Sequence, residues 1–409
     1  MTEAPVGLWR NREFTLLWTS QSLSDLGTAI SGLAVPLLVL TLTGSPVQAG
    51  LVGTIGLVVG VLTRLPAGLL VDRLDRRRIM LACDVVRLVA YLALGVVVLD
   101  GGVSPFAVLA VVVIGAAANS LFGTAEHSSL RNIVPSAQLP AAVARNEART
   151  YGTALAGPPL GGLLFGVGRA LPFFGDALTF LASLCGVALV RRPLQEPRTP
   201  VAGGNAAALA EGLRFVFGNP FLRAVLLIAA PLNLAISGII FTIIVTLQRR
   251  HTPPGVIGLV ETVVAVGGLL GALVAPAVQR RLPLPVLIRG ICWAAAGFMA
   301  ISALLTSSVL AAVPVAITVF LGPASNAALF GHQAAITPDR LQGRVVSVVI
   351  VVATSVSAAA PLLAGLLIAT WGSPVAIGVF AGSVVGSAVA ATVSRGVRSM
   401  PPVPVSLPS

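Results

Sequence analysis

Two acidic residues lie inside long apolar stretches of this chain, where a charge is costly. Asp25 is near the middle of the stretch 14–40, and Glu261 is about a third of the way into 254–278. A charge at the centre of a bilayer costs about 2.5–3.5 kcal/mol, so such a group faces a cavity, is paired or is neutral. In a partly dry cavity a carboxylate can bind and release a proton. Asp25 and Glu261 are therefore candidate proton carriers, and a structural acid is the alternative for each.

Polar residues recur around Asp25 at intervals of three or four, which places them on one face of a helix: Gln21, Ser24, Thr28 and Ser31. We expect this face to line a central substrate path. An internal repeat of 208 residues, described below, places Asn233 opposite Asp25. The full set of candidate cavity residues is Gln21, Thr28, Asn119, Asn233, Ser237 and Asn326.

Further charges flank a short basic link at residue 74. Arg64 lies ten residues before Leu74 and Asp84 ten after it, so both should be at similar depth on adjacent helices. Arg87 is one helical turn from Asp84. We expect Arg64, Asp84 and Arg87 to form a structural or gating network. Asp176 is near the outer end of its apolar stretch and is expected to be interfacial.

No residue pattern of an enzyme or a metal site stands out. The chain has no G-x-x-x-x-G-K-[ST] phosphate loop. No Cys, His and carboxylate set has metal-ligand spacing, and no Ser, His and acid arrangement suggests nucleophilic catalysis. The three cysteines lie in three different apolar stretches, so we expect no disulfide. The sequence predicts no enzymatic activity, no cofactor and no bound metal.

The elements that carry these residues are predicted from composition. Of 409 residues, 56% are hydrophobic and 10% charged, whereas a soluble domain has about a quarter of its residues charged. About 20 apolar residues cross a bilayer as a helix, and barrel strands would be shorter and alternating. Twelve stretches qualify as membrane helices: 14–40, 46–70, 79–99, 104–125, 150–167, 172–190, 222–247, 254–278, 285–306, 309–330, 345–370 and 374–394.

Basic residues are distributed unevenly between the two sides of these helices. All 26 are Arg, and the formal net charge is +12. If the N-terminus is cytoplasmic, Arg169, Arg249 and Arg250 are the ones in outer segments, and nearly all others border cytoplasmic segments. Cytoplasmic loops of membrane proteins carry this excess of positive charge. We therefore expect both termini in the cytoplasm and no nucleic-acid partner.

Landmarks recur along the chain at a constant offset of 203 residues: Gly68 and Gly271, Pro135 and Pro338, Pro158 and Pro361. At the starts of the halves the offset is 208, between Asn11 and Asn219. Duplicated six-helix halves are typical of one large class of transporters. The predicted organisation is a six-helix bundle at 1–192, a cytoplasmic linker at 193–218, a second bundle at 219–398 and a disordered tail at 399–409. Within the linker, Ala206–Phe217 is expected to be either an interfacial amphipathic helix or a plain linker.

Residues 68–80, GLLVDRLDRRRIM, resemble the loop motif G-x-L-A-D-R-x-G-R-R-x-x-L of the major facilitator superfamily. The matching positions are Gly68, Leu70, Asp72, Arg73, Arg76 and Arg77. Asp75 replaces the second Gly and Val71 the Ala. In that family the loop locks the cytoplasmic side in the outward-facing state, so the resemblance implies a cytoplasmic gate. The alternative is that these Arg residues only set the topology.

The fifth stretch contains Gly157-Pro158-Pro159-Leu160-Gly161-Gly162, which is similar to the GPxxGG motif of drug and proton antiporters in the same family. The resemblance implies export, with Gly157, Pro158, Gly161 and Gly162 as the antiporter motif. Pro removes a backbone hydrogen bond and Gly permits close packing, so this helix can bend. Plain helix packing is the alternative.

Further segments resemble the branch that contains the enterobactin exporter and the macrolide efflux proteins: 11–14 (NREF), 42–46 (LTGSP), 71–73 (VDR), 176–180 (DALTF) and 343–345 (GRV). The resemblance covers about 10–395. It departs at the fourth stretch, because Val103–Thr124 has no Arg where many proton-driven exporters carry one. Proton coupling would have to use other groups.

The resemblance implies an all-α integral membrane protein with twelve transmembrane helices in two pseudo-symmetric six-helix bundles. It implies a monomeric secondary transporter of the bacterial plasma (inner) membrane, in contact with lipids, that exports amphipathic small molecules (a drug, an antibiotic or a siderophore) by proton antiport. Alternatives are a metabolite importer or lipid transporter of the same fold, and a non-transporting membrane receptor or enzyme.

Overall fold

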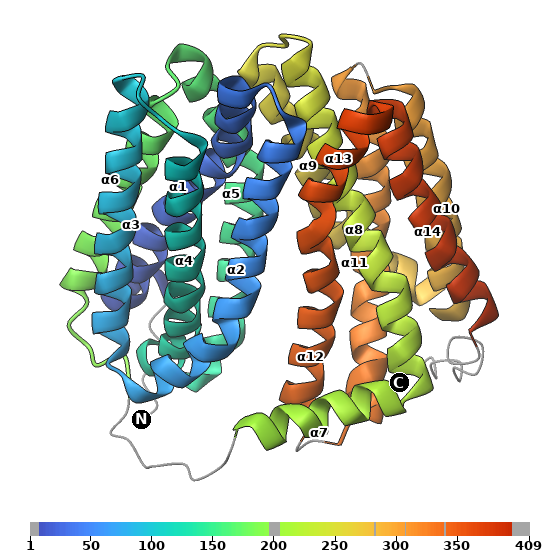
Figure 1. Cartoon of the computed structure of the whole chain (residues 1–409). Coiled ribbons are helices and arrows are strands. Elements are labelled where there is room, and N and C mark those ends of the chain that lie inside the picture. The colour runs from blue at the N-terminus through green and yellow to red at the C-terminus, as the bar shows by residue number, and fades with distance from the viewer. Residues whose placement is uncertain (1–7, 196–204, 282–283, 307, 339–340, 395–409) are drawn as a thin grey trace. The chain divides into compact units, whose positions relative to one another are not determined.

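The computed structural model describes residues 8–195, 205–281, 284–306, 308–338 and 341–394, and these residues are almost entirely helical (Figure 1). The first half contains α1 (Arg12–Thr43), α2 (Pro46–Arg73), α3 (Arg76–Leu99), α4 (Pro105–Ile133), α5 (Leu139–Val167) and α6 (Leu171–Leu189). The remainder contains α7 (Asn205–Gly218), α8 (Pro220–Arg249), α9 (Pro254–Arg281), α10 (Leu284–Leu304), α11 (Ala312–Ile336), α12 (Gln342–Ser355), α13 (Ala360–Trp371) and α14 (Ser373–Val393).

Several helices begin at a polar cap followed directly by Pro, as in Ser45-Pro46, Ser104-Pro105 and Asn219-Pro220. The Ser104 hydroxyl accepts a hydrogen bond from the Ala107 amide at 3.2 Å. Such a cap satisfies an amide that has no partner within the helix, and it contributes about 1 kcal/mol. Pro at the first turn has no amide to leave unsatisfied. The sequence therefore determines these helix starts locally.

Eleven helical segments within the described ranges are long and apolar enough to cross a membrane. One of them, Val345–Trp371, joins α12 and α13 through a short 3₁₀ segment, Val356–Ala359. The predicted span 150–167 is helical within α5 but is not among the eleven, because its Gly, Pro and Thr residues make it less apolar. The predicted all-α membrane fold is confirmed. The residues predicted as a disordered tail lie outside the described ranges.

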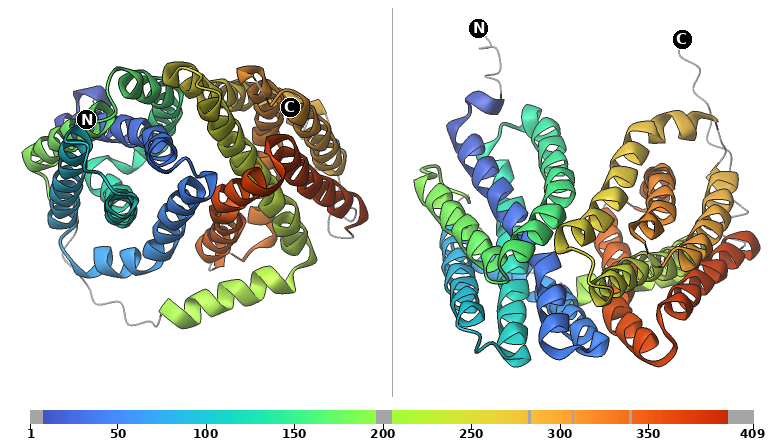
Figure 2. Two further views of the ribbon diagram at one scale, coloured as in Figure 1. Left: turned by 45° about the horizontal axis from the view of Figure 1, so that its top comes forward. Right: turned by 90° about the horizontal axis from the view of Figure 1, so that it is seen from above.

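The chain divides into two compact units, which are viewed from two further directions in Figure 2. The first unit comprises Met1–Pro200 with His251–Thr262, and the second comprises Val201–Arg250 with Val263–Ser409. In the first unit α1 packs against α5 and α6, and α3 packs against α4 and α6. In the second, α8 packs against α14, and α10 packs against α11 and α14. The predicted linker contains helix α7, and the predicted domain boundaries stay a prediction.

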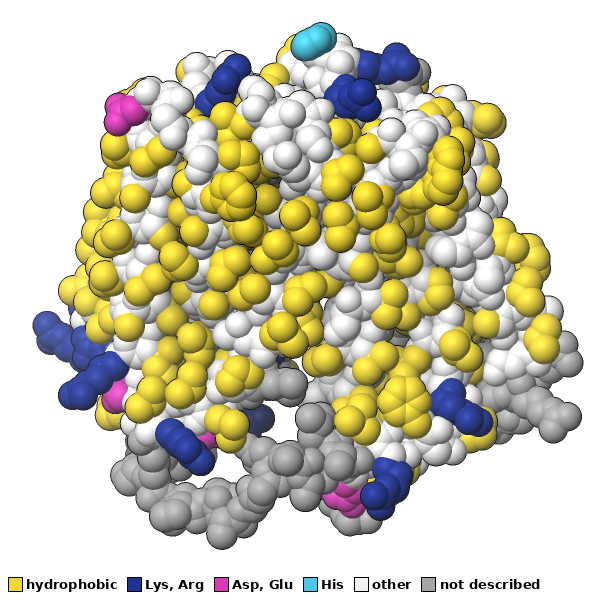
Figure 3. Space-filling model, in the orientation of Figure 1, with side chains coloured by type: hydrophobic (Ala, Val, Ile, Leu, Met, Phe, Trp, Pro, Cys, Tyr) yellow, Lys and Arg dark blue, Asp and Glu magenta, His cyan; other side chains and the backbone are white. Residues whose placement is uncertain are grey.

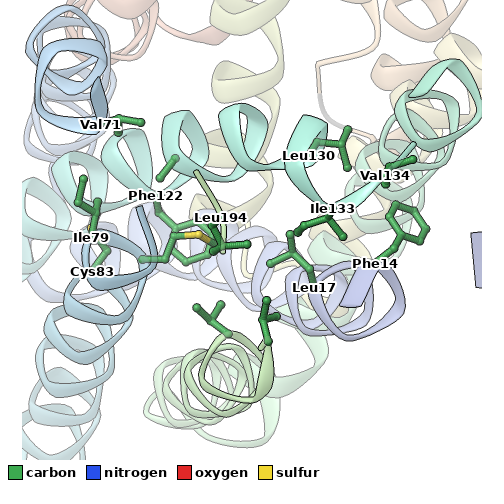
Figure 4. Packing of buried hydrophobic residues seen from close by; sticks show 14 of the residues in the cluster. Phe14, Leu17, Val71, Ile79, Cys83, Phe122, Leu130, Ile133, Val134 and Leu194 are labelled. Atoms are coloured by element: carbon green, nitrogen blue, oxygen red, sulfur yellow. The ribbon is translucent and has the colours of Figure 1, made fainter. Parts of the chain in front are cut away.

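Each unit has its own apolar core. In the first unit it joins the start of α1, the link between α2 and α3, and α4 (Figure 4); its labelled members are Phe14, Leu17, Val71, Ile79, Cys83, Phe122, Leu130, Ile133, Val134 and Leu194. In the second unit the core centres on Leu222 of α8 and Val345 of α12. Outside the cores, apolar side chains cover the sides of the helices, while Arg residues gather toward the helix ends (Figure 3). That arrangement suits a protein whose helices are surrounded by lipid.

Candidate functional site

Three charged side chains from three helices meet inside the first unit, and we call them the charged triad: Asp25 of α1, Glu126 of α4 and Arg149 of α5. The Arg149 Nε lies 2.8 Å from Asp25 Oδ2 and an Arg149 terminal nitrogen lies 2.7 Å from Glu126 Oε1. The Nε contact lacks hydrogen-bond geometry and is an ion pair only. Arg149 and Glu126 are 5% and 8% exposed, but Asp25 is 35% exposed. Asp25 is therefore the accessible member of the triad.

The sequence analysis missed two members of the triad because both lie one residue outside the spans it predicted. The fourth span was expected to end at residue 125 and the fifth to begin at 150. In the structure α4 continues to Ile133, and α5 begins at Leu139. A hydropathy window stops at a charge, whereas a helix continues through a charge that is paired. Reading Glu126 and Arg149 as opposite charges at the ends of consecutive spans would have suggested the pair.

A second network, which we call the α3 pair, is centred on Asp84 and Arg87. The carboxylate and the guanidinium form a fully buried ion pair within α3. Ser183 of α6 donates to Asp84 at 2.7 Å, and Gln21 of α1 donates to Ser183 at 3.1 Å. Arg87 also donates to the Asn119 side chain at 3.3 Å. The pair therefore joins α3 to three neighbouring helices.

Aromatic rings enclose the α3 pair. The Arg87 guanidinium lies 4.7 Å from the ring centre of Phe122 and 4.4 Å from that of Phe180. A desolvated cation on an aromatic face gains about 2 kcal/mol. The predicted partnership of Asp84 with Arg87 is present. Arg64 was predicted to join this network, but it does not, because its side chain is exposed on α2 and has no ion pair among the described residues.

The predicted gate residues lie where α2 passes into α3. Asp72 is exposed near the end of α2, and a Cβ at Gly68 would have no neighbour within 4 Å. Arg73 is the last residue of α2. Asp75 caps α3 by accepting a hydrogen bond from the Arg78 amide at 2.9 Å. The departure from Gly at this position therefore supplies a helix cap.

Two further Arg residues of the loop motif fasten the start of α3 to its neighbours. Arg76 donates to the carbonyl oxygen of Ser128 in α4 at 2.8 Å and to that of Leu194 at 3.1 Å. Arg77 donates to the carbonyl oxygen of Ala188 in α6. Ser128 and Ala188 lie in the C-terminal parts of α4 and α6, where a cation is favoured. Within the first unit, these contacts hold the link in place.

The Gly and Pro motif of α5 is a site of close packing. A Cβ at Gly157 would strike Ala29, and a Cβ at Gly161 would strike the backbone of Ile30, so α1 approaches α5 closely at both. On another side, Gly162 packs against Pro254, which also belongs to the first unit. Helix α5 continues through Pro158. The close helix packing expected of this motif is therefore present, and its role in antiport stays a prediction.

The remaining cavity candidates are scattered. Gln21 is 2% exposed and is held in the α3 pair network, so it does not line an open surface in this structure. Asn119 is exposed, and Thr28 is half-buried on α1. In the second unit, Asn233 donates to the Ala229 carbonyl within α8 at 2.9 Å. Ser237 is half-buried and Asn326 is exposed.

Glu261 of α9 and Asp176 of α6 are two further acids inside predicted membrane helices, and their surroundings differ. Glu261 is half-buried, and no hydrogen bond or ion pair involves it within the described part of the chain. Asp176 was expected at the depth of the membrane interface, which stays a prediction, and its side chain is fully buried within the protein. It accepts a hydrogen bond from Ser31 of α1 at 2.5 Å. A polar partner on a neighbouring helix, which the sequence alone does not show, accounts for its burial.

The second unit contains an apolar cavity of about 260 Å³ between α9, α10 and α11. Its lining includes Gly271 of α9, Leu287 and Gly290 of α10, and Phe320 of α11. No charged side chain lines it. Sequence reasoning gave no indication of this cavity, since its walls consist of ordinary apolar residues.

Comparison with known proteins agrees with this architecture. Residues 17–348 match the family model described as Major Facilitator Superfamily. The chain is 29% identical over 259 residues to the multidrug efflux pump Tap of Mycolicibacterium fortuitum. This match covers 60% of this chain and 62% of the relative. The chain is 28% identical over 272 residues to a pump of the same name in Mycobacterium tuberculosis, covering 63% of each. The matched part is thus less than two thirds of either relative.

Two solved structures have a similar fold. A bacterial homologue of the human lysosomal transporter Spinster, in an inward-facing and occupied conformation, has a TM-score of 0.72 at 17% identity, covering 95% of this chain and 96% of that one. A bacterial homologue of the iron transporter ferroportin, in an inward-facing state, has a TM-score of 0.72 at 18% identity and covers 95% and 99%. At these identities the likeness shows the fold alone.

Proposed function

The chain belongs to the Major Facilitator Superfamily of transporters, and we propose that it exports amphipathic small molecules in exchange for protons by alternating access. The relatives named multidrug efflux pumps support the direction of transport. The Gly-Pro motif at Gly157–Gly162 supports it as well, since it resembles that of antiporters. A drug, an antibiotic or a siderophore fits the proposal. The protein then lies in the bacterial plasma membrane as a monomer with both termini cytoplasmic, and the loop from Gly68 to Arg77 is its cytoplasmic gate.

The charged triad is the observation that carries this proposal. Two carboxylates share one guanidinium, so the ionised triad has a net charge of −1. A proton on Asp25 makes the triad neutral and leaves Arg149 bound to Glu126 alone. Proton binding at the accessible acid thus changes which helices Arg149 ties together, because Asp25 is on α1 and Glu126 on α4. Coupling between protonation and helix packing is what an antiporter needs.

Glu261 is the second proposed proton carrier. It lies in a membrane-crossing helix, and no ion pair within the described ranges neutralises it. A carboxyl group in that position is far less costly as the neutral acid.

Many proton-driven exporters have an Arg in the segment that corresponds to Val103–Thr124, and this chain has none there. We therefore assign to Arg149 the role of the basic residue that pairs with a coupling acid, Asp25.

Transport assays with neutral variants test the proposal. In inside-out vesicles with an imposed pH gradient, Asp25→Asn and Glu261→Gln should each abolish proton-driven uptake of a fluorescent amphipathic dye. Each should retain exchange of dye down its own gradient. The matched control is Glu147→Gln, which neutralises an exposed acid two residues from Arg149 in α5. If both variants respond to the pH gradient as the parent does, neither acid carries protons.

A further inference from the structure

Asp176 belongs to neither charged network, although it is as deeply buried as the α3 pair. It lies in the second turn of α6, facing α1. Gly27 of α1 makes room for it, since a Cβ at that position would lie 2.5 Å from Asp176 Oδ1. Ser31, one turn further along α1, donates to Asp176 Oδ2 at 2.5 Å. This carboxyl group therefore lies at a point where α1 and α6 approach closely.

Within the described part of the chain, no cation forms an ion pair with Asp176. Arg77 of α3 binds Ala188, at the end of α6 away from Asp176. Further along α3, Asp84, Arg87 and Tyr91 face α6, and Arg87 is already paired with Asp84 and enclosed by Phe122 and Phe180. On α1, Asp25 is paired with Arg149 on the side toward α5. The ionisable residues of α5 lie in its first half, between 145 and 151, at the end away from Asp176. None of the ion pairs found in the described ranges includes Asp176.

The hydrogen count at Thr179 shows which form of the acid fits. The Thr179 hydroxyl oxygen lies 2.7 Å from the backbone carbonyl oxygen of Asp176 and 3.3 Å from Asp176 Oδ1. A hydroxyl has one hydrogen, and a carbonyl oxygen can only accept. The hydroxyl hydrogen therefore belongs to the shorter contact, with the backbone. The contact with Oδ1 is then a hydrogen bond only if Oδ1 carries a hydrogen of its own.

We propose that Asp176 is a protonated carboxylic acid that joins α1 to α6, accepting from Ser31 through Oδ2 and donating to Thr179 through Oδ1. An unpaired carboxylate in a dry interior costs several kcal/mol, whereas a hydrogen-bonded neutral acid does not. Asp176 is thus a proton-binding site separate from the charged triad. Its role is to position α1, the helix that carries Asp25. The inference stands whether or not the protein is an exporter.

Infrared spectroscopy of the purified protein in lipid nanodiscs tests this directly. At neutral pH, Asp176→Asn should lose one carbonyl band of a protonated carboxylic acid. The control Asp100→Asn alters an exposed acid at the end of α3 and should lose a carboxylate band instead. Loss of a carboxylate band in Asp176→Asn would overturn the proposal.

A second variant keeps the test decisive if Asp176→Asn does not fold. Ser31→Ala removes one hydrogen bond to the acid without removing the acid, so the same band should persist and shift to higher frequency. An unshifted spectrum would contradict the proposed contact.

The melting temperature measured over a range of pH provides a further test. An acid that is ionised in both the folded and the unfolded protein would not make this temperature depend on pH. In the unfolded parent Asp176 ionises above about pH 4, whereas the folded parent must keep the proton or hold a buried unpaired charge, and Asp176→Asn has neither cost. The melting temperature of the parent should therefore fall relative to that of the variant as the pH rises. Parallel curves over the whole range would refute a protonated Asp176.

Discussion

The interiors of the two units are filled in different ways. The four ion pairs found among the described residues all lie in the first unit. In the second unit, an apolar cavity lies between α9, α10 and α11. The offset of 203 residues that relates the two halves places Leu287 and Gly290 at the positions of Asp84 and Arg87. Both Leu287 and Gly290 line the cavity.

This correspondence explains how duplicated halves can share a helix arrangement and still differ in chemistry. In the first unit the Arg87 side chain fills the space between α3, α4 and α6, and Asp84 compensates its charge. At the corresponding positions of α10, Leu replaces the acid and Gly replaces the base, so neither brings a charge. The cavity beside them lies between α9, α10 and α11, the counterparts of α2, α3 and α4. The helices persist because apolar faces hold them together in both halves, while the buried charges are an addition to the first.

The largest effect should come from removing the shared cation of the triad. Arg149→Ala leaves Asp25 and Glu126 without a partner, and breaking a buried pair in this way costs about 3 kcal/mol. We expect a strongly lowered melting temperature in detergent and loss of proton-driven transport. The control Arg131→Ala removes an exposed Arg of α4 and should change neither.

A combined variant separates stability from function in the same region. Replacing Arg149 by Met together with Asp25→Asn and Glu126→Gln removes every charge of the triad, so stability should return while transport does not. Recovery of transport in this triple variant would show that the triad is only structural.

The next effect is expected on stability alone, without loss of transport, when the α3 pair is made apolar like its counterpart. Arg87→Met alone leaves the buried Asp84 without its partner and should destabilise the protein by about 3 kcal/mol, measured by thermal unfolding. Adding Asp84→Leu should restore most of the stability, since a well-packed apolar pair often replaces a buried ion pair without loss. Transport should survive in the double variant. If it does not, the pair has a role beyond packing that the second unit lacks.

The smallest effects should come from the apolar cavity, where two glycines give opposite results. A Cβ at Gly290 would meet nothing within 4 Å, so Gly290→Ala should raise stability by about 0.5–1 kcal/mol. A Cβ at Gly271 would strike the backbone of Phe320, so Gly271→Ala should lower stability by about 1–3 kcal/mol. Both glycines line the same cavity, and the melting temperatures of the two variants check this prediction. Equal shifts would mean that the cavity is not open as described.

Most of the fold could be predicted from the sequence. The hydropathy of consecutive stretches predicted the membrane helices, and caps such as Ser104-Pro105 marked where some of them begin. The errors were in helix lengths, since α4 and α5 continue past their apolar parts. Those extensions carry Glu126 and Arg149, so a small error in the helix ends concealed two of the three members of the charged triad.

The site itself could be predicted only in part. Asp84 and Arg87 are one turn apart on a single helix, and their pairing follows from helix geometry. Arg64 was assigned to the same network from its depth alone, but depth does not determine which side of α2 it occupies. The sequence placed Asp176 near the end of its helix, but that position does not reveal its partner on α1.

What the sequence determined by itself is the set of membrane helices, the duplication and the excess of Arg at one set of helix ends. These follow from local properties, since apolar length and capping act within a single segment. Only the tertiary structure decided that Arg149 binds Asp25, 124 residues away, and that Asp176 meets Ser31. Such partners depend on which helices are neighbours and how each is rotated about its axis. Both are set by the packing of whole helices against one another.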